Sequence, residues 1–360
     1  MSPQLSIVRD DVRALAAYHV PDASGLVKLD AMENPYTLAP ELQQQLGERL
    51  GALALNRYPV PSYASLKAAI RNTMRIPAGF DVILGNGSDE LITIVSTACA
   101  KPGAKVLAPV PGFVMYAMSA QLAGLDFIGV PLRADFSLDL DAMLAAIRAQ
   151  RPAITYLAYP NNPTGNLFDL EAMLAIIHEV GDTGLVVVDE AYQPFAGTSF
   201  LPRLPEYPNV VLMRTVSKLG LAGIRLGYLS AASALLAEFD KVRPPYNVGV
   251  LNQAAGEVML AHHAVLVEQA ERILAERSRL YRWLAQLPDV ICFPSDANFI
   301  LIRVKDAPGI YAAMKQRKVL IRTLHGSHPL LQQCLRLTVG TPQENDAMML
   351  ALEQALADAA

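Results

Sequence analysis

The residues best suited to chemistry begin with a lysine and an arginine seven positions apart in an apolar run. Lys218 and Arg225 lie in LMRTVSKLGLAGIRLGYL (212–229), where small and apolar residues fill most of the gap. A lysine that is desolvated near a second cation has a lowered pKa, and its amine can then form a Schiff base with an aldehyde. An arginine can bind a phosphate through two parallel hydrogen bonds. The alternative for Lys218 is a surface lysine whose alkyl chain lies along apolar neighbours.

Three more groups of polar residues follow apolar runs, namely GNGSDE (85–90), YPNNPTG (159–165) and VVVDEAY (186–192). The first could bind a phosphate at the start of a helix, and Asp189 in the third could face a cationic group. Each group also has a simpler interpretation, as a capped turn, a tight Asn-Pro turn or an aspartate that caps the next turn. Because ligands bind at the carboxyl ends of strands in open parallel sheets, the groups together indicate one site.

Short apolar runs and amphipathic stretches alternate in the part of the chain that carries these groups. Such alternation predicts strands joined by crossover helices, and therefore an α/β fold with a mostly parallel sheet covered by helices. The expected strands lie at 81–85, 104–110, 126–132, 153–160, 184–192 and 209–215, and the clearest expected helices at 89–100, 139–150 and 169–180.

The pattern changes near residue 240. One long helical pattern is expected from about 249 to 287, followed by shorter strands in 290–293, 298–304 and 335–339. These elements predict a second, smaller α+β domain. The expected division is an N-terminal arm that joins the small domain (1–29), a large cofactor-binding domain (30–248) and a small C-terminal domain (249–360).

The composition excludes several other classes of protein. Of the 360 residues 52% are hydrophobic and 18% are charged, which is enough for a large core, and the net charge of -4 gives no reason to expect nucleic acid. The three cysteines have no paired spacing, so neither a disulfide framework nor a metal site is expected. The start of the chain lacks a signal-peptide pattern, and no apolar run is long enough for a membrane span. A cytoplasmic location is the resulting expectation.

The motifs together resemble the fold-type I, pyridoxal-5'-phosphate-dependent aminotransferases. The similarity extends over nearly the whole chain and is greatest to the histidinol-phosphate aminotransferase branch. It rests on five motifs that occur in the order of the family: NRYP, GNGSDE, PNNPTG, DEAY and SK followed by GLAGIRLGY. DEAY and the last motif are the most specific.

The resemblance implies how pyridoxal 5'-phosphate is held. It implies that Lys218 forms a Schiff base with the cofactor and acts as the proton-transfer base, and that Asp189 pairs with the ring nitrogen. The other residues that it assigns to the cofactor are Tyr192 and Asn162 at the ring hydroxyl, Phe113 on the ring face, and Ser88, Asp89, Ser217 and Arg225 at the phosphate.

The same resemblance implies a homodimer with shared active sites, in which Tyr58 reaches the phosphate of the cofactor in the neighbouring subunit. Arg336 resembles the arginine that binds the acidic end of the substrate, and Arg322 and Tyr18 are implied around the substrate phosphate. For Arg322 and for Tyr18 the alternative is that the residue is exposed and solvated.

Three features depart from the pattern of the branch. Phe113 occupies a ring-stacking position that is usually tyrosine, and Met32 stands where an asparagine is common. The interval from Lys218 to Arg225 is one residue shorter than usual, so a locally repacked loop is expected.

The function implied by the resemblance is the transamination of histidinol phosphate with 2-oxoglutarate in histidine biosynthesis. An aromatic amino-acid aminotransferase is an alternative, because pockets for imidazole and phenyl rings are similar. A pyridoxal-phosphate-dependent decarboxylase or lyase is a third, because such enzymes share the cofactor-binding residues. A transcription regulator built on this scaffold would need an additional DNA-binding domain, for which the first 30 residues are too few.

Overall fold

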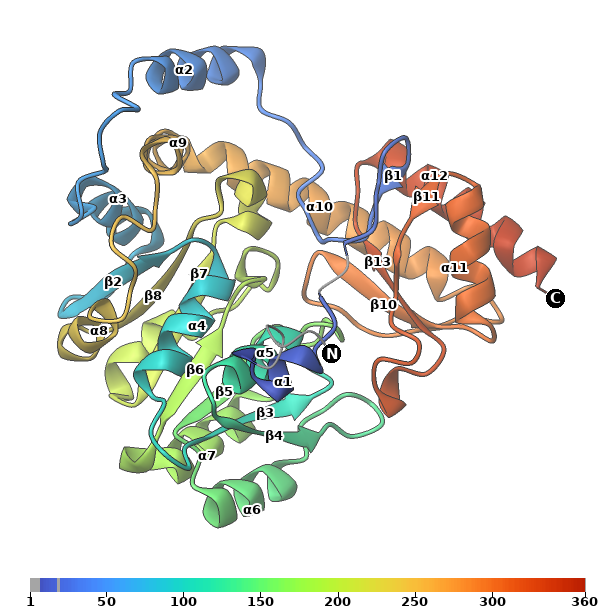
Figure 1. Cartoon of the computed structure of the whole chain (residues 1–360). Helices are drawn as coiled ribbons and strands as arrows, with labels where there is room; N and C mark the ends of the chain where they lie inside the picture. The colour runs from blue at the N-terminus through green and yellow to red at the C-terminus, as the bar shows by residue number, and fades with distance from the viewer. Residues whose placement is uncertain (1–6, 18–19, 360) are drawn as a thin grey trace.

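In the computed structural model, which describes residues 7–17 and 20–359, the largest sheet has seven strands in the order β2-β8-β7-β6-β5-β3-β4 (Figure 1). Strand β8 is antiparallel to both of its neighbours, and the other pairs are parallel. The prediction of a mostly parallel α/β sheet is therefore confirmed. The strands are β2 (Phe80–Gly85), β3 (Lys105–Val110), β4 (Asp126–Pro131), β5 (Ile154–Ala158), β6 (Leu185–Asp189), β7 (Val210–Thr215) and β8 (Gly227–Ala232).

Helices cover both faces of this sheet, which explains why its central strands β5, β6 and β7 are buried and largely apolar. Val186 and Val188 of β6 belong to a buried cluster with the helices α6 (Leu140–Gln150) and α7 (Leu170–Val180). Val187, between them, points to the opposite face and packs with α4 (Ser88–Ala98), α5 (Val114–Leu122) and α8 (Ser233–Asp240).

A second sheet lies toward the C-terminus, on the right in Figure 1. It has four antiparallel strands in the order β12-β13-β10-β9, and helices α11 (Ala307–Gln316) and α12 (Pro342–Asp358) pack near it. Strand β1 pairs in parallel with β11, so residues 27–28 lie against this part of the protein, whereas Arg9 donates hydrogen bonds to the backbone oxygens of Gln121 and Leu122 at the end of α5. These strands are β1 (Val27–Lys28), β9 (Ile291–Cys292), β10 (Phe299–Arg303), β11 (Val319–Leu320), β12 (Arg322–Thr323) and β13 (Cys334–Thr338).

The prediction of one long helix from about 249 to 287 is wrong in detail, because the chain forms two helices there. Helix α9 (Val250–Ala261) ends at His262, and α10 (His263–Leu284) begins directly after it and runs toward the second sheet (Figure 1). The break needs only one non-helical residue, with φ −104° and ψ 28° at His262. The sequence AHHA at this point contains neither glycine nor proline, so the pattern gives no sign of it.

Two elements beside the site were not expected from the sequence. Strand β8 consists largely of small residues, and the apolar side chains of α5 are not confined to one helical face. The remaining elements are α1 (Asp10–Arg13), α2 (Pro40–Gly51), α3 (Ala64–Met74) and the short helical turns η2 (Gly181–Thr183), η3 (Gln193–Phe195), η4 (Leu201–Glu206), η5 (Ser217–Leu221), η6 (Ala222–Ile224) and η7 (Pro329–Leu331).

Candidate active site

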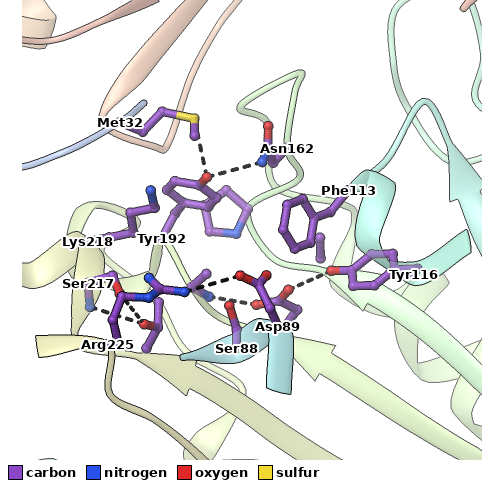
Figure 2. Close-up of a pocket in the computed structure, with 15 residues that line it drawn as sticks. Met32, Ser88, Asp89, Phe113, Tyr116, Asn162, Tyr192, Ser217, Lys218 and Arg225 are labelled. Carbon is purple, nitrogen blue, oxygen red and sulfur yellow. Dashed lines mark hydrogen bonds and ion pairs between the residues drawn. The ribbon is translucent and has the colours of Figure 1, made fainter. Parts of the chain in front are cut away.

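The main candidate site is a cavity of about 610 Å³ at the carboxyl ends of β5, β6 and β7 (Figure 2). Parallel strands end together at this edge of the sheet, and the start of α4 closes the cavity on one side. Its lining residues are Met32, Ser88, Asp89, Phe113, Tyr116, Ala158, Pro160, Asn162, Asp189, Ala191, Tyr192, Thr215, Ser217, Lys218 and Arg225. The structure thus brings nine of the sequence-predicted cofactor and catalytic residues to one place.

Lys218 lies three residues beyond the end of β7, and its amine projects into this cavity (Figure 2). The Nζ atom donates a hydrogen bond to the backbone oxygen of Ala31 at 2.9 Å and lies 5.8 Å from the centre of the Tyr192 ring. Burial is the largest cause that lowers the pKa of Lys218, to about 8, and the positive charge of Arg336 is the next. Arg225, the cation expected from the sequence, contributes less. The result is an amine that is partly uncharged near neutral pH.

Asp189, the last residue of β6, is 5% exposed and faces the cavity. Its Oδ1 atom accepts a hydrogen bond from the Ala191 N–H at 3.0 Å, and its Oδ2 atom accepts one from the Tyr116 hydroxyl at 2.6 Å. Burial raises the pKa of Asp189 to about 6, although both hydrogen bonds oppose the rise. A buried carboxylate of this kind would be stabilised by a cationic group in the cavity, such as a protonated ring nitrogen.

Side chains from four segments of the chain form a hydrogen-bonded group at the wall of the cavity. The Tyr192 hydroxyl accepts a hydrogen bond from Asn162 Nδ2 at 3.2 Å and donates one to the Met32 sulfur at 3.3 Å. Asn162 Oδ1 in turn accepts a hydrogen bond from Arg336 Nη1 at 2.7 Å. Tyr192 and Asn162 therefore present a hydroxyl and an amide side by side, which suits a phenolic oxygen of a ligand.

The other end of the cavity has the features of an anion site. Helix α4 begins at Ser88 after Gly87, which adopts a φ of 83° and has no side chain with which to cap the helix. The first backbone N–H groups of a helix attract a phosphate. Arg225 lies beside them and pairs with the Asp89 carboxylate at 3.2 Å. The Ser217 hydroxyl accepts a hydrogen bond from the Thr215 hydroxyl at 2.9 Å.

The loop between Lys218 and Arg225 is tightly wound. It forms the π-helical turn η5 and the 3-10 turn η6, with positive φ angles at Gly220 (135°) and Arg225 (47°). Together the two turns include every residue from Ser217 to Ile224.

A second cavity, of about 1100 Å³, adjoins the first and shares Met32, Phe113 and Asn162 with it. Arg322 and Arg336, which pair across β12 and β13, both line it. Arg336 is buried, and its Nη2 atom donates a hydrogen bond to the Asp30 backbone oxygen at 2.9 Å. This cavity therefore presents two guanidinium groups to an acidic ligand.

Of the predicted site residues that the structure describes, Tyr58 is not brought to either cavity. Tyr58 is 80% exposed and stacks on Tyr246, with 4.6 Å between the ring centres. Within its own subunit Tyr58 therefore lines neither cavity. Tyr18 lies outside the described residues.

The sequence reasoning missed Tyr116, which contacts Asp189 directly. The only signal was a tyrosine three residues after Phe113, at the start of a segment that was not expected to be a helix. The Ala31 backbone oxygen was also missed, because its contact with Lys218 joins residues 187 positions apart. Thr215 was missed as well, although its hydrogen bond to Ser217 is local.

Neither a metal site nor a membrane span is found in the described ranges. Over residues 7–17 and 20–359, no three histidine, cysteine, aspartate or glutamate side chains are grouped so that they could hold a metal ion. Within the same residues, no helix combines the length and the apolar character that a membrane span requires.

Comparison with known proteins gives a consistent result. The class I and II aminotransferase family matches residues 24–352. "Histidinol-phosphate aminotransferase 1" of Ralstonia nicotianae is 59% identical over 98% of this chain and 95% of its own length. "Histidinol-phosphate aminotransferase 2" of Cupriavidus pinatubonensis is also 59% identical, over 98% of this chain and 97% of its own length.

Among solved structures, histidinol-phosphate aminotransferase from Sinorhizobium meliloti in complex with pyridoxal-5'-phosphate superimposes with a TM-score of 0.88. It is 26% identical and covers 99% of both chains. The fold of the chain is thus shared with a protein that binds this cofactor.

Proposed function

The chain belongs to the class I and II aminotransferase family, and we propose that it transfers the amino group of histidinol phosphate to 2-oxoglutarate, yielding imidazole acetol phosphate and glutamate for histidine biosynthesis. The observation that carries this proposal is the pairing of two adjoining cavities. One holds a lysine amine, a buried carboxylate and a helix N-terminus, and the other holds Arg322 and Arg336. The names of the relatives with 59% identity support the same substrate.

The cofactor is pyridoxal 5'-phosphate, which supplies an aldehyde that takes up the amino group and a ring that withdraws electrons from the substrate carbon. The residues of the first cavity fit such a group. Lys218 would hold its aldehyde carbon, Asp189 its ring nitrogen, and Tyr192 with Asn162 its ring hydroxyl. Phe113 would cover the ring face, and the phosphate would lie against the backbone of Ser88 and Asp89, the Ser217 hydroxyl and Arg225.

Lys218 is the residue that moves the proton. Its pKa of about 8 leaves roughly a tenth of the amine uncharged at pH 7, compared with well under a thousandth for an ordinary lysine. The uncharged amine could take a proton from the substrate carbon and return it to the former aldehyde carbon of the cofactor, as general base and then general acid. Asp189, when charged, favours the positive ring nitrogen and so the withdrawal of electrons.

The second cavity would bind the acidic end of each substrate. A phosphate dianion is best held by more than one cation, and Arg322 and Arg336 lie opposite each other across two paired strands. The carboxylate of 2-oxoglutarate would use Arg336. Tyr18, which lies outside the described residues, stays a prediction for the substrate phosphate.

The active form is proposed to be a homodimer with shared sites. Tyr58 belongs to a group of exposed apolar residues, which also includes Leu55, Val60, Tyr246 and Leu251. Exposed apolar groups of this kind are typical of subunit interfaces, where Tyr58 could reach the phosphate of the partner's cofactor.

The division into an arm (1–29), a large domain (30–248) and a small domain (249–360) also stays a proposal. A cytoplasmic location is supported by the three unpaired cysteines.

A half-reaction tests the proposed activity. Purified protein loaded with cofactor should lose the absorbance of the lysine-bound form when histidinol phosphate is added, and 2-oxoglutarate should restore it. Lys218→Ala should show neither change, whereas Lys241→Ala, at an exposed lysine paired with Glu238, should behave as the unmodified protein. If histidinol phosphate produces no change while another amine does, the proposed substrate is wrong.

A further inference from the structure

Tyr116 is a buried tyrosine that donates a hydrogen bond to one oxygen of the Asp189 carboxylate. It is 2% exposed, and its hydroxyl donates the hydrogen bond of 2.6 Å to Oδ2 of Asp189 (Figure 2). The Ala191 N–H binds the other oxygen, Oδ1, at 3.0 Å. Each carboxylate oxygen therefore has one fixed donor, and together the two donors fix the orientation of the carboxylate group.

The position of this hydroxyl is set by the packing of the Tyr116 ring. The ring stacks on that of Tyr156, with 4.2 Å between centres and 6° between planes. It also meets Phe113 edge-on, with 5.6 Å between centres and 87° between planes. Tyr116 thus contacts both the residue proposed to cover the cofactor ring and the residue proposed to pair with its nitrogen.

The hydroxyl also acts on the charge of Asp189. Burial favours the neutral acid and raises the pKa of Asp189, and the charges of Asp89 and Glu190 act in the same direction. The hydrogen bonds from Tyr116 and Ala191 lower it, because they stabilise the charged form. Of these two donors only the Tyr116 hydroxyl belongs to a side chain, so it is the one that a substitution can remove.

We propose that Tyr116 is a positioning residue that keeps Asp189 charged and aimed at the ring nitrogen of the cofactor. The proposal deepens the proposed function and depends on it, since it assumes that Asp189 meets that nitrogen. Tyr116 touches the carboxylate and makes no proton transfer itself. Its effect should therefore appear in the protonation of the ring nitrogen as well as in the rate.

The test is ¹⁵N NMR of the loaded enzyme, reconstituted with pyridoxal phosphate labelled at the ring nitrogen, because the chemical shift reports how far the proton lies toward nitrogen. Tyr116→Phe removes only the hydroxyl. Its signal should move toward that of an unprotonated ring, any titration midpoint should fall by roughly one to two pH units, and kcat should fall about tenfold or more. KM for 2-oxoglutarate should change less than kcat.

Tyr156→Phe is the matched control, because it removes a buried hydroxyl from the stacked neighbour, which makes no hydrogen bond to Asp189. It should keep the signal and kcat of the unmodified enzyme. If Tyr116→Phe does not fold, 3-fluorotyrosine at position 116 replaces it. This residue is a stronger donor of the same shape and should move the signal toward fuller protonation.

Asp189→Asn separates the two proposals. If it leaves the signal unchanged, Asp189 does not pair with the nitrogen and the proposed cofactor arrangement fails. If it shifts the signal but neither change at Tyr116 does, the role of Tyr116 is overturned while the proposed function stands.

Discussion

At the scale of single residues, burial controls the protonation of the two groups that matter most. It lowers the pKa of the Lys218 amine to about 8 and raises that of the Asp189 carboxyl to about 6. Both shifts move a group toward its uncharged form, as expected for ionisable side chains away from water. The lowered pKa makes the Lys218 amine a usable base. The rise in the pKa of Asp189 is opposed by the hydrogen bonds that the Tyr116 hydroxyl and the Ala191 N–H donate to it.

The lowered pKa of Lys218 predicts unusual reactivity in the cofactor-free protein. Because a lower pKa means more uncharged amine at a given pH, reductive methylation of Lys218 should reach half its maximal rate near pH 8. A lysine in a short unstructured peptide should do so about two units higher. Peptide mapping by mass spectrometry across a pH series measures this. A Lys218 profile that coincides with that of the short peptide would contradict the assignment.

The sequence could predict which residue types gather at the strand ends, but not every contact among them. Lys218, Asp189 and Asn162 follow apolar runs, so they could be placed near one another from the sequence alone. The bond from Tyr116 to Asp189 joins residues 73 positions apart and depends on how α5 packs against the sheet. The influence of Arg336 on Lys218 likewise depends on how the second sheet meets the first cavity.

At the scale of elements, the strands β2 to β7 were predictable because each is a short run of mostly apolar residues, as expected in a sheet covered on both faces. Strand β8 lacks that signal, and the separation of α9 from α10 at His262 occurs without a helix-breaking residue type. The start of α4 matters most for the site, because the first turn of this helix faces Arg225. The sequence GNGSDE indicated this start, and the φ of 83° at Gly87 is a conformation that favours glycine.

Gly87→Ala should therefore weaken cofactor binding. A Cβ atom at this position would lie 2.7 Å from Nη2 of Arg225, so the guanidinium would have to move away from the start of α4. Loss of one charge-assisted hydrogen bond corresponds to roughly a tenfold to hundredfold rise in Kd for pyridoxal phosphate. Fluorescence titration of the cofactor-free protein measures it.

Gly79→Ala is the control for backbone strain, because Gly79 has the same φ of 83° but no heavy atom within 4 Å of the point where a Cβ would lie. It should bind the cofactor normally. Equal Kd values for the two variants would show that crowding of Arg225 is not the cause.

At the scale of the whole molecule, the exposed position of Tyr58 is explained if active sites are completed only in a dimer. A mixture of Lys218→Ala with Tyr58→Ala should then recover activity that neither variant has alone. In a mixed dimer one site receives both changes and the other neither, so about a quarter of full activity is expected after random exchange. Differently tagged subunits confirm the exchange. No recovery despite exchange would place Tyr58 outside the partner's site.

The central claim is that the protein is built for a phosphorylated amine, and the ratio of kcat/KM for histidinol phosphate to that for phenylalanine tests it most directly. Each additional charge-assisted bond should contribute about 1.5–3 kcal/mol before desolvation, so a preference of at least roughly tenfold for histidinol phosphate is expected. Arg322→Ala should reduce this preference and change phenylalanine turnover little. If the unmodified enzyme uses phenylalanine as well as histidinol phosphate, an aromatic amino-acid aminotransferase replaces the proposed function.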